Sequence, residues 1–215
     1  MNEKKENIPE PKKTFYSIIL KRVLDIIVSG IALVCFSPIV LIISILELIF
    51  HGRPVIYKQK RPGLNGKVFN IYKFRTMTNE VDSNGDLLPS HKRITKFGRV
   101  LRRFSLDELP ELWCIFVGKM SIIGPRPLRE EYLPMYSRRH QYRHSVRPGL
   151  ACVRLVPGET WTWNDQFEND IYYIEHISFT LDLRMAIAIV REALHPSTYR
   201  VEATRKPFDG SNLNE

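Results

Sequence analysis

The sequence has few cysteines, and their spacing excludes two classes of protein. Its 215 residues include three, Cys35, Cys114 and Cys152, an odd number without the paired spacing of a zinc site. We therefore expect neither a disulfide framework nor a structural zinc, and a reducing, cytosolic setting fits best. A lone buried thiol usually packs as a small apolar group, so we assign no chemistry to these residues.

Charge is absent from one stretch of the chain and one-sided in another. Residues 26–46 carry no charged side chain and are about as long as a helix that crosses a bilayer. Residues 87–106 contain no acidic residue but several lysines and arginines, within a net charge of +9. This pattern indicates a partner that carries phosphates, which could be nucleic acid, an anionic membrane surface or a phosphorylated small substrate.

Ser37 and Pro38 interrupt the apolar stretch. Proline removes a backbone donor, and the serine can hydrogen-bond the freed carbonyl, so we expect a bend here. Basic residues flank the stretch on both sides, beginning with Lys21 and Arg22 before it. Because positive flanks favour the cytoplasmic face, we predict a re-entrant helix that enters the membrane, turns at Pro38 and leaves on the same side. A mildly kinked ordinary span is the alternative.

The chain after the membrane segment predicts an α+β, mainly helical domain. We expect two short strands joined by a turn, at Val55–Lys60 and Lys67–Phe74. We also expect an amphipathic helix suited to the membrane interface at Ile94–Phe104, and two further helices at Asp107–Gly118 and Ile177–Leu194. We divide the chain into a disordered charged leader (1–14), a re-entrant membrane helix-break-helix (15–52), a cytosolic catalytic domain (53–200) and a polar, frayed C-terminal tail (201–215).

Two adjacent carboxylates, Asp107 and Glu108, follow the basic segment. Ser105-Leu106-Asp107-Glu108 also has the pattern of a capping box, in which Ser105 caps a helix and Glu108 reaches back to its backbone. Pro110 weakens that interpretation, because in such a helix it lies beyond the first turn and costs a hydrogen bond. In either case nearby arginines and the helix dipole should hold both carboxylates ionised, competent as a nucleophile or a metal ligand.

Three basic side chains lie in settings suited to phosphate. Arg126 is presented rigidly between two prolines, and arginine is suited to gripping phosphate. Lys73 and Arg75 alternate out of one face at the end of the second predicted strand. For each of them a solvated surface position is the alternative.

Several ordered motifs resemble the bacterial sugar transferases called monotopic phosphoglycosyl transferases. The resemblance runs from about Lys21 to Gly149 and resumes over Phe167–Leu183. The motifs that carry it are Lys21-Arg22 with Asp25, Ser37-Pro38, Gln59-Lys60-Arg61-Pro62-Gly63, Ile71–Met77, Ser105-Leu106-Asp107-Glu108-Leu109-Pro110 and Met120–Pro127.

The resemblance implies a domain resting on the membrane and a Mg²⁺-dependent reaction in two steps. Asp107 would attack the phosphate bonded to the sugar of a nucleotide sugar, expelling a nucleoside monophosphate, and would also be the metal ligand. Polyprenyl (undecaprenyl) phosphate would then attack the aspartyl phosphosugar. Glu108 would assist by positioning groups or by handling the proton of the acceptor.

The same resemblance suggests which basic residues bind the substrate phosphates. Arg102 and Arg126 are our candidates for stabilising the charge that develops in phosphoryl transfer. Lys73, Arg75 and Arg61 complete the predicted substrate-binding set.

The implied partners are a nucleotide-sugar donor, with uridine diphosphate as carrier, the polyprenyl phosphate acceptor and membrane lipids. No nucleic-acid partner is expected, and a homodimer is possible. The implied location is the bacterial inner membrane with the catalytic domain facing the cytoplasm, for a first step in glycoconjugate assembly. Leu150–Trp161 departs from the family pattern, which leaves the sugar open.

Two alternatives belong to other classes. A membrane-anchored nucleic-acid-binding protein would explain the basic segments, but no groove-reading helix or aromatic strand platform is recognisable. A catalytically weak scaffold of a glycan-assembly complex would explain the divergent Leu150–Trp161 segment.

Overall fold

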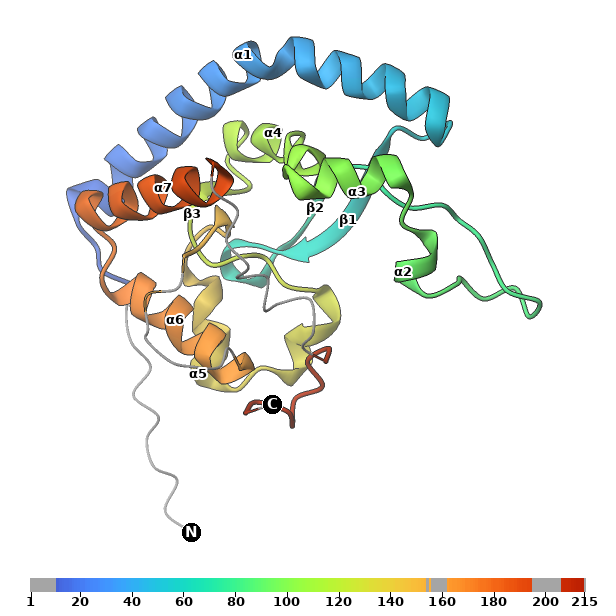
Figure 1. Ribbon diagram of the computed structural model, residues 1–215. Helices are drawn as coiled ribbons and strands as arrows, with labels where there is room; N and C mark the ends of the chain where they lie inside the picture. Colours follow the sequence, from blue (N-terminus) through green and yellow to red (C-terminus); the bar gives the residue numbers. More distant parts are fainter. Residues whose placement is uncertain (1–10, 154, 156–161, 195–205, 215) are drawn as a thin grey trace.

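The computed structural model describes residues 11–153, 155, 162–194 and 206–214 (Figure 1). Residues 1–10 of the predicted leader, 201–205 of the predicted tail and most of the divergent segment lie outside the described residues. The helices and 3-10 or π turns are η1 Tyr16–Leu20, α1 Lys21–Phe50, η2 Leu64–Gly66, α2 Ser90–Arg93, α3 Lys96–Arg103, η3 Leu106–Glu108, α4 Glu111–Phe116, η4 Glu130–Met135, α5 Arg138–Gln141, η5 Tyr142–Ser145, α6 Trp163–Glu175 and α7 Phe179–Leu194. The strands are β1 Ile56–Pro62, β2 Val68–Phe74, β3 Ser121–Ile123 and β4 Gly149–Ala151.

The apolar stretch forms one long helix over Tyr16–Phe50, 35 residues, which is long and apolar enough to cross a membrane. The Ser37 hydroxyl donates to the Val34 carbonyl oxygen at 2.7 Å, the carbonyl that Pro38 cannot bond because it lacks an N–H. The predicted rescue of the freed carbonyl is confirmed. α1 continues through Pro38 without the expected break, but it changes direction near its middle, as expected of a bend, and arches over the rest of the molecule (Figure 1).

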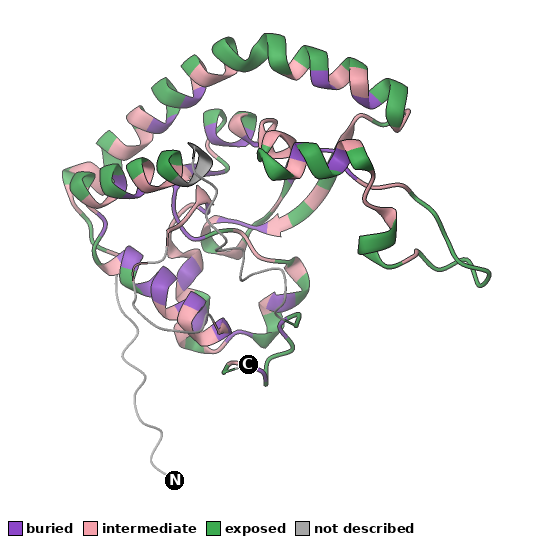
Figure 2. Ribbon diagram, viewed as in Figure 1, coloured by how far each residue is buried: buried purple, intermediate pink, exposed green. Residues whose placement is uncertain are grey.

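Both ends of this helix are fixed to the folded domain. Near its start, the Asp25 carboxylate accepts a hydrogen bond from the Ile122 backbone N–H at 3.0 Å. Just after its end, His51 Nε2 lies 2.9 Å from Thr95 Oγ1, and Ile43 is buried in a core cluster with side chains of β2 and α3. The helix is therefore part of the wall of the domain, although most of its outer surface is exposed (Figure 2).

The predicted hairpin is confirmed. β1 pairs with β2 antiparallel from Ile56↔Phe74 to Pro62↔Val68, so β1 runs two residues further than expected. Asn65 at φ 55° and Gly66 at φ 70° make the turn, in a left-handed region that suits these residue types.

A second, parallel sheet of β3 and β4 was not predicted. Its register pairs Ser121 with Gly149 and Ile123 with Ala151. A Cβ on Gly149 would lie 2.2 Å from the Gly124 backbone nitrogen, so glycine is required for the two segments to approach each other. Strands of three residues are too short for a recognisable alternation, which is why the sequence did not indicate them.

The C-terminal part differs from expectation in its last residues. The predicted helix at Ile177–Leu194 is confirmed as α7, which starts two residues later. Residues 206–214, expected to be polar and frayed, are mostly exposed, but Phe208 within them is only 3% exposed and packs on the domain. It contacts the rings of Tyr132 and Phe167 at centroid distances of 5.6 and 5.2 Å. An aromatic cluster beside α6 thus holds this part of the tail against the domain. Many residues of α6 are buried (Figure 2).

Candidate active site

A left-handed residue sets the position of the acidic pair. Thr95 caps α3, and Ser105, at φ 54°, turns the chain out of it into the 3-10 turn η3. The helix α4 starts only at Glu111, with Pro110 as its N-cap, so the helix predicted from Asp107 is wrong in its start. The capping-box alternative is wrong too, because the Ser105 side chain makes no capping hydrogen bond.

Glu108 is bound by two cations. Lys73 Nζ from β2 lies 2.6 Å from its Oε1, and Arg126 Nη2 from the loop after β3 lies 2.5 Å from the same oxygen. Burial by itself would raise the pKa of Glu108, but the charges of Arg126 and Lys73 outweigh it and hold that pKa below its usual value. Glu108 is therefore a fixed anion, as expected.

Asp107 has a different environment. Its carboxylate makes no ion pair with any residue that the structure describes. Burial, and then the neighbouring charge of Glu108, raise the pKa of Asp107, whereas Lys73 and Arg102 oppose the shift. The arginine that was expected to help keep Asp107 ionised, Arg102, is thus outweighed in its effect on the pKa of Asp107. Two adjacent acids in unlike environments can take two different roles.

Glu111 is a third carboxylate at the site, and the sequence analysis missed it. Its Oε1 lies 3.0 Å from Lys73 Nζ, and its side chain is only 5% exposed. Burial is the main reason that the pKa of Glu111 is raised. Lys73 therefore holds Glu108 and Glu111 together. The available signal was their spacing, since residues three apart on a helical turn lie on one side.

Arg102 and Arg61 lie near the acidic pair. Arg102 Nε donates to Thr76 Oγ1 at 2.8 Å, and its charge acts on Asp107. Burial, and then the charges of Arg129 and Arg126, lower the pKa of Arg61. Arg61 therefore belongs to the cationic edge of the site, next to Arg126.

Arg75, predicted to bind substrate, points away from the acidic pair. Its Nη1 donates to the Arg53 carbonyl oxygen at 3.2 Å and its Nε to the Met77 carbonyl oxygen at 3.3 Å. Lys73, two residues earlier on the same face of β2, points to the acidic pair. Because Phe74 ends the strand, the alternation that places Lys73 at the site does not extend to Arg75.

The donor set fits a magnesium ion that depends on few protein ligands. Within the described ranges no group of three or more His, Cys, Asp or Glu side chains could hold a metal. Mg²⁺ commonly takes one or two carboxylates and completes its shell with water and substrate phosphates. The Asp107 carboxylate, whose oxygen atoms are hard donors, would be such a ligand.

Two of the cysteines are shielded from solvent, Cys114 fully and Cys152 in part. Burial raises the pKa of Cys114 to about 11 and that of Cys152 well above its usual value. Because the thiolate is the reactive form, both are poor nucleophiles near neutral pH.

The fold combines a long helix with the length and composition of a membrane helix and a domain whose acidic pair is set among cations. The chain belongs to the bacterial sugar transferase family, whose model matches residues 16–196. The predicted family, and with it the prediction of a transferase enzyme, is confirmed.

Relatives within the family agree with this assignment. An uncharacterized sugar transferase of Bacillus subtilis (strain 168), EpsL, is 44% identical over 178 residues, which cover 82% of this chain and 88% of EpsL. A UDP-glucose:undecaprenyl-phosphate glucose-1-phosphate transferase of Klebsiella pneumoniae is 35% identical, over 85% of this chain and 42% of that protein. A UDP-N-acetylgalactosamine-undecaprenyl-phosphate N-acetylgalactosaminephosphotransferase of Aeromonas hydrophila is 33% identical, over 87% and 45%. The chain spans less than half the length of the last two.

Proposed function

We propose that the protein transfers a sugar 1-phosphate from a UDP-sugar to undecaprenyl phosphate through a covalent intermediate on Asp107. The names of the Klebsiella and Aeromonas relatives support the reaction class. The observation that carries the proposal is the unequal pair, in which two cations bind Glu108 while Asp107 makes no ion pair among the described residues.

In the first step, an Asp107 carboxylate oxygen attacks the phosphorus that carries the sugar. A phosphorus–oxygen bond forms to Asp107, the bond between the two phosphates breaks, and uridine monophosphate leaves with that bridging oxygen. Arg126, which contacts Glu108, and Arg102, whose charge acts on Asp107, stabilise the negative charge on the phosphoryl oxygens. Asp107 and the donor phosphates would hold Mg²⁺, which would neutralise phosphate charge when bound.

In the second step, an oxygen of undecaprenyl phosphate attacks the same phosphorus. The Asp107–phosphorus bond breaks, which returns the free carboxylate and leaves a diphosphate link between the lipid and the sugar. Glu108 keeps the cations in place through both steps, because Lys73 and Arg126 share one of its oxygens. We assign Glu108 to positioning these groups.

The helix geometry supports a re-entrant topology. Asp25 and His51 flank the apolar stretch and both bond to the same folded domain, at Ile122 and Thr95. Because both ends of the helix reach one domain, we propose that they share one side of the membrane, the cytoplasmic side of the bacterial inner membrane. A soluble donor and a lipid acceptor then meet at that surface.

A transfer assay tests the reaction. The purified protein is incubated with Mg²⁺, undecaprenyl phosphate and a panel of labelled UDP-sugars that includes UDP-glucose and UDP-N-acetylgalactosamine. Wild type should release uridine monophosphate and label the lipid, and Asp107→Asn should lose at least about 10⁴-fold in rate. Asp86→Asn, in an exposed loop, is the matched control and should keep full activity.

The same assay separates the covalent route from its alternatives. Without the lipid acceptor, wild type should release one uridine monophosphate per enzyme and gain the mass of the sugar phosphate. Unchanged turnover by Asp107→Asn would refute the nucleophile. Silence of wild type across the whole donor panel would favour the scaffold hypothesis.

Accessibility labelling tests the topology. Lys5→Cys and Lys60→Cys are made separately in a chain whose Cys35, Cys114 and Cys152 are replaced. An impermeant thiol reagent should reach neither cysteine in intact cells and both in inside-out vesicles. Labelling of either one from outside would rule out the re-entrant arrangement.

A further inference from the structure

The backbone around Arg126 is more firmly fixed than the side chain that it presents to the acidic pair. The Arg126 side chain contacts Glu108 but is 45% exposed. Pro125 and Pro127 fix the φ angles on either side of it, and the proline that follows disfavours a helical conformation at Arg126 itself. Because little else in this backbone can rotate, the orientation of the Arg126 carbonyl determines the direction in which the side chain starts.

A guanidinium group from η5 holds that carbonyl. Arg143 Nη2 donates to the Arg126 carbonyl oxygen at 2.8 Å and lies 2.7 Å from Asp170 Oδ2 of α6. Nη1 of the same side chain donates to the Tyr136 hydroxyl at 3.2 Å. One planar group therefore joins the Arg126 backbone to an acid in the core.

The Arg143–Asp170 pair lies where apolar side chains would also fit. The two side chains are only 2% and 3% exposed, and the rings of Tyr136 and Phe167 lie 5.8 and 5.6 Å from Arg143 Cζ. Taking two charges out of water costs free energy, and apolar residues of similar volume are often as stabilising as a buried ion pair, or more so. Stability alone does not account for the pair, whereas the fixed direction of a guanidinium group does.

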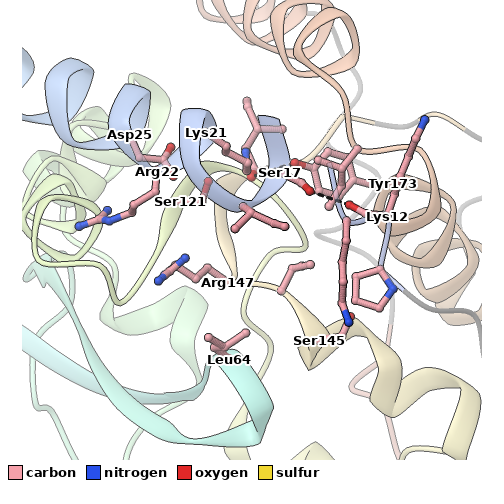
Figure 3. A pocket seen from close by; sticks show the side chains of 16 residues that line it. Lys12, Ser17, Lys21, Arg22, Asp25, Leu64, Ser121, Ser145, Arg147 and Tyr173 are labelled. Atoms are coloured by element: carbon pink, nitrogen blue, oxygen red, sulfur yellow. Dashed lines mark hydrogen bonds between the residues drawn. The ribbon is translucent and has the colours of Figure 1, made fainter. Parts of the chain in front are cut away.

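The elements that carry the pair are anchored on the far side from Arg126. Three residues after Asp170, Tyr173 lines a cavity at the start of α1 (Figure 3), and its hydroxyl donates to Asp182 Oδ1 at 2.8 Å. Just after η5, Arg147 Nε donates to the Gly118 carbonyl oxygen at 3.0 Å. A side chain supported from rigid elements can hold its partner in one place.

We infer that Arg143 and Asp170 are positioning residues for Arg126. Asp170 fixes the Arg143 guanidinium, Arg143 fixes the Arg126 carbonyl, and the Arg126 side chain then reaches the acidic pair. Both residues act from the core rather than by touching the substrate. The inference rests on the proposed function for the task of Arg126, the stabilisation of phosphoryl charge, and it adds two residues to that site.

An apolar replacement of the whole pair separates positioning from stability. Arg143→Met with Asp170→Ala removes both charges together, so no unpaired charge stays buried, and Tm should stay within about 5 °C of wild type. Arg143→Lys keeps a charge opposite Asp170 but lacks the fork of two Nη atoms. Arg139→Met is the matched control, because Arg139 of α5 also pairs with an acid of α6, Glu168, at 2.6 Å.

The transfer assay measures the position of Arg126 through kcat. The double variant and Arg143→Lys should each lower kcat by about 10- to 100-fold and change KM for the donor by less than about threefold, because a displaced Arg126 weakens charge stabilisation in the transition state. In a chain that already carries Arg126→Met, the double variant should cost no more than about twofold further, since residues that act through one group are not additive. Arg139→Met should keep the kcat of its parent chain in both backgrounds.

Hydrogen exchange tests the same role without any substrate. In the double variant, the amides of residues 124–132 should exchange at least about tenfold faster than in wild type, while those of α6 keep their rates. Arg139→Met should leave exchange over residues 124–132 unchanged.

The inference is overturned if the double variant keeps full kcat, if Arg143→Lys is as active as wild type, or if the losses multiply in the Arg126→Met chain. Exchange that accelerates over α6 as much as over residues 124–132 would overturn it too. A wild type that transfers nothing, with the localised change in exchange still present in the double variant, would count against the proposed function alone. Equal transfer by wild type and the double variant would count against this inference alone.

Discussion

Lys73→Met removes the cation that lies between two carboxylates, 2.6 Å from Glu108 and 3.0 Å from Glu111. Glu108 keeps Arg126, but Glu111, only 5% exposed in its side chain, loses the cation in contact with it. Breaking a buried ion pair from one side costs about 3–5 kcal/mol. Because Lys73 is itself 21% exposed, we expect a smaller loss of unfolding free energy, about 2–3 kcal/mol.

The measurement is Tm at a fixed heating rate in detergent. For a chain of this size, about 1 kcal/mol corresponds to about 2–4 °C, so Lys73→Met should lower Tm by about 4–12 °C. Adding Glu111→Gln removes the unpaired charge and should restore about 1–2 kcal/mol of the loss. Lys119→Met, at an exposed position, is the matched control and should stay within about 0.5 kcal/mol of wild type.

The loss should also depend on pH. Burial raises the pKa of Glu111 in the folded protein and Lys73 opposes that shift, so without Lys73 the pKa rises further. When the pKa of Glu111 is higher in the folded than in the unfolded protein, its protonation stabilises the folded state at pH values below the ordinary glutamate pKa of 4.5. This stabilisation is lost as the pH rises through the pKa of Glu111 in the folded protein. The Tm deficit should therefore be small near pH 4 and grow towards pH 8. A deficit independent of pH, or no recovery with Glu111→Gln, would refute the role assigned to Lys73.

Three further predictions follow from the same structure. Because burial and Glu108 raise the pKa of Asp107, single-turnover rates should fall on the acid side at a pH above the ordinary aspartate value, and Glu108→Gln should move that limb to lower pH. Gly98→Ala should destabilise by more than about 3 kcal/mol, since its Cβ would lie 2.1 Å from a backbone oxygen, whereas Gly30→Ala, 3.4 Å from a side chain, should be tolerated. Phe208→Ala should cost about 3–5 kcal/mol, because the ring is only 3% exposed; thermal unfolding measures both effects.

The sequence indicated the elements that carry a strong local pattern. The apolar run predicted the long helix, the period of apolar residues predicted α3, and the stop at His195-Pro196 predicted the end of α7. The Pro, Gly and Asn residues of 61–66 marked the hairpin turn. The sheet of β3 and β4 joins short strands that are far apart in sequence, and the docking of Phe208 depends on a tertiary aromatic cluster. Neither leaves a periodic pattern in the chain.

The candidate site was predicted in its parts but not in its electrostatics. Lys73, Glu108 and Arg126 come from three separate segments, and only the ordered motifs linked them before the structure brought them into contact. Opposite pKa directions for Asp107 and Glu108 depend on burial and on which carboxylate receives the cations. Lys73 points to the acidic pair and Arg75 does not, because β2 ends between them. The alternation of side chains along a strand does not by itself predict where the strand ends.

The hydrogen bond from Ile122 to Asp25 joins residues 97 positions apart, and this separation orders events during synthesis. At about 5–20 residues per second, the ribosome needs about 5–20 s to make Ile122 after Asp25. Throughout that time the apolar helix carries a carboxylate whose final partner does not yet exist, and a charged aspartate deep in a bilayer costs about 2.5–3.5 kcal/mol. For the membrane placement proposed above, we therefore predict that completion of the domain, rather than insertion of the apolar segment, fixes the final position of the helix.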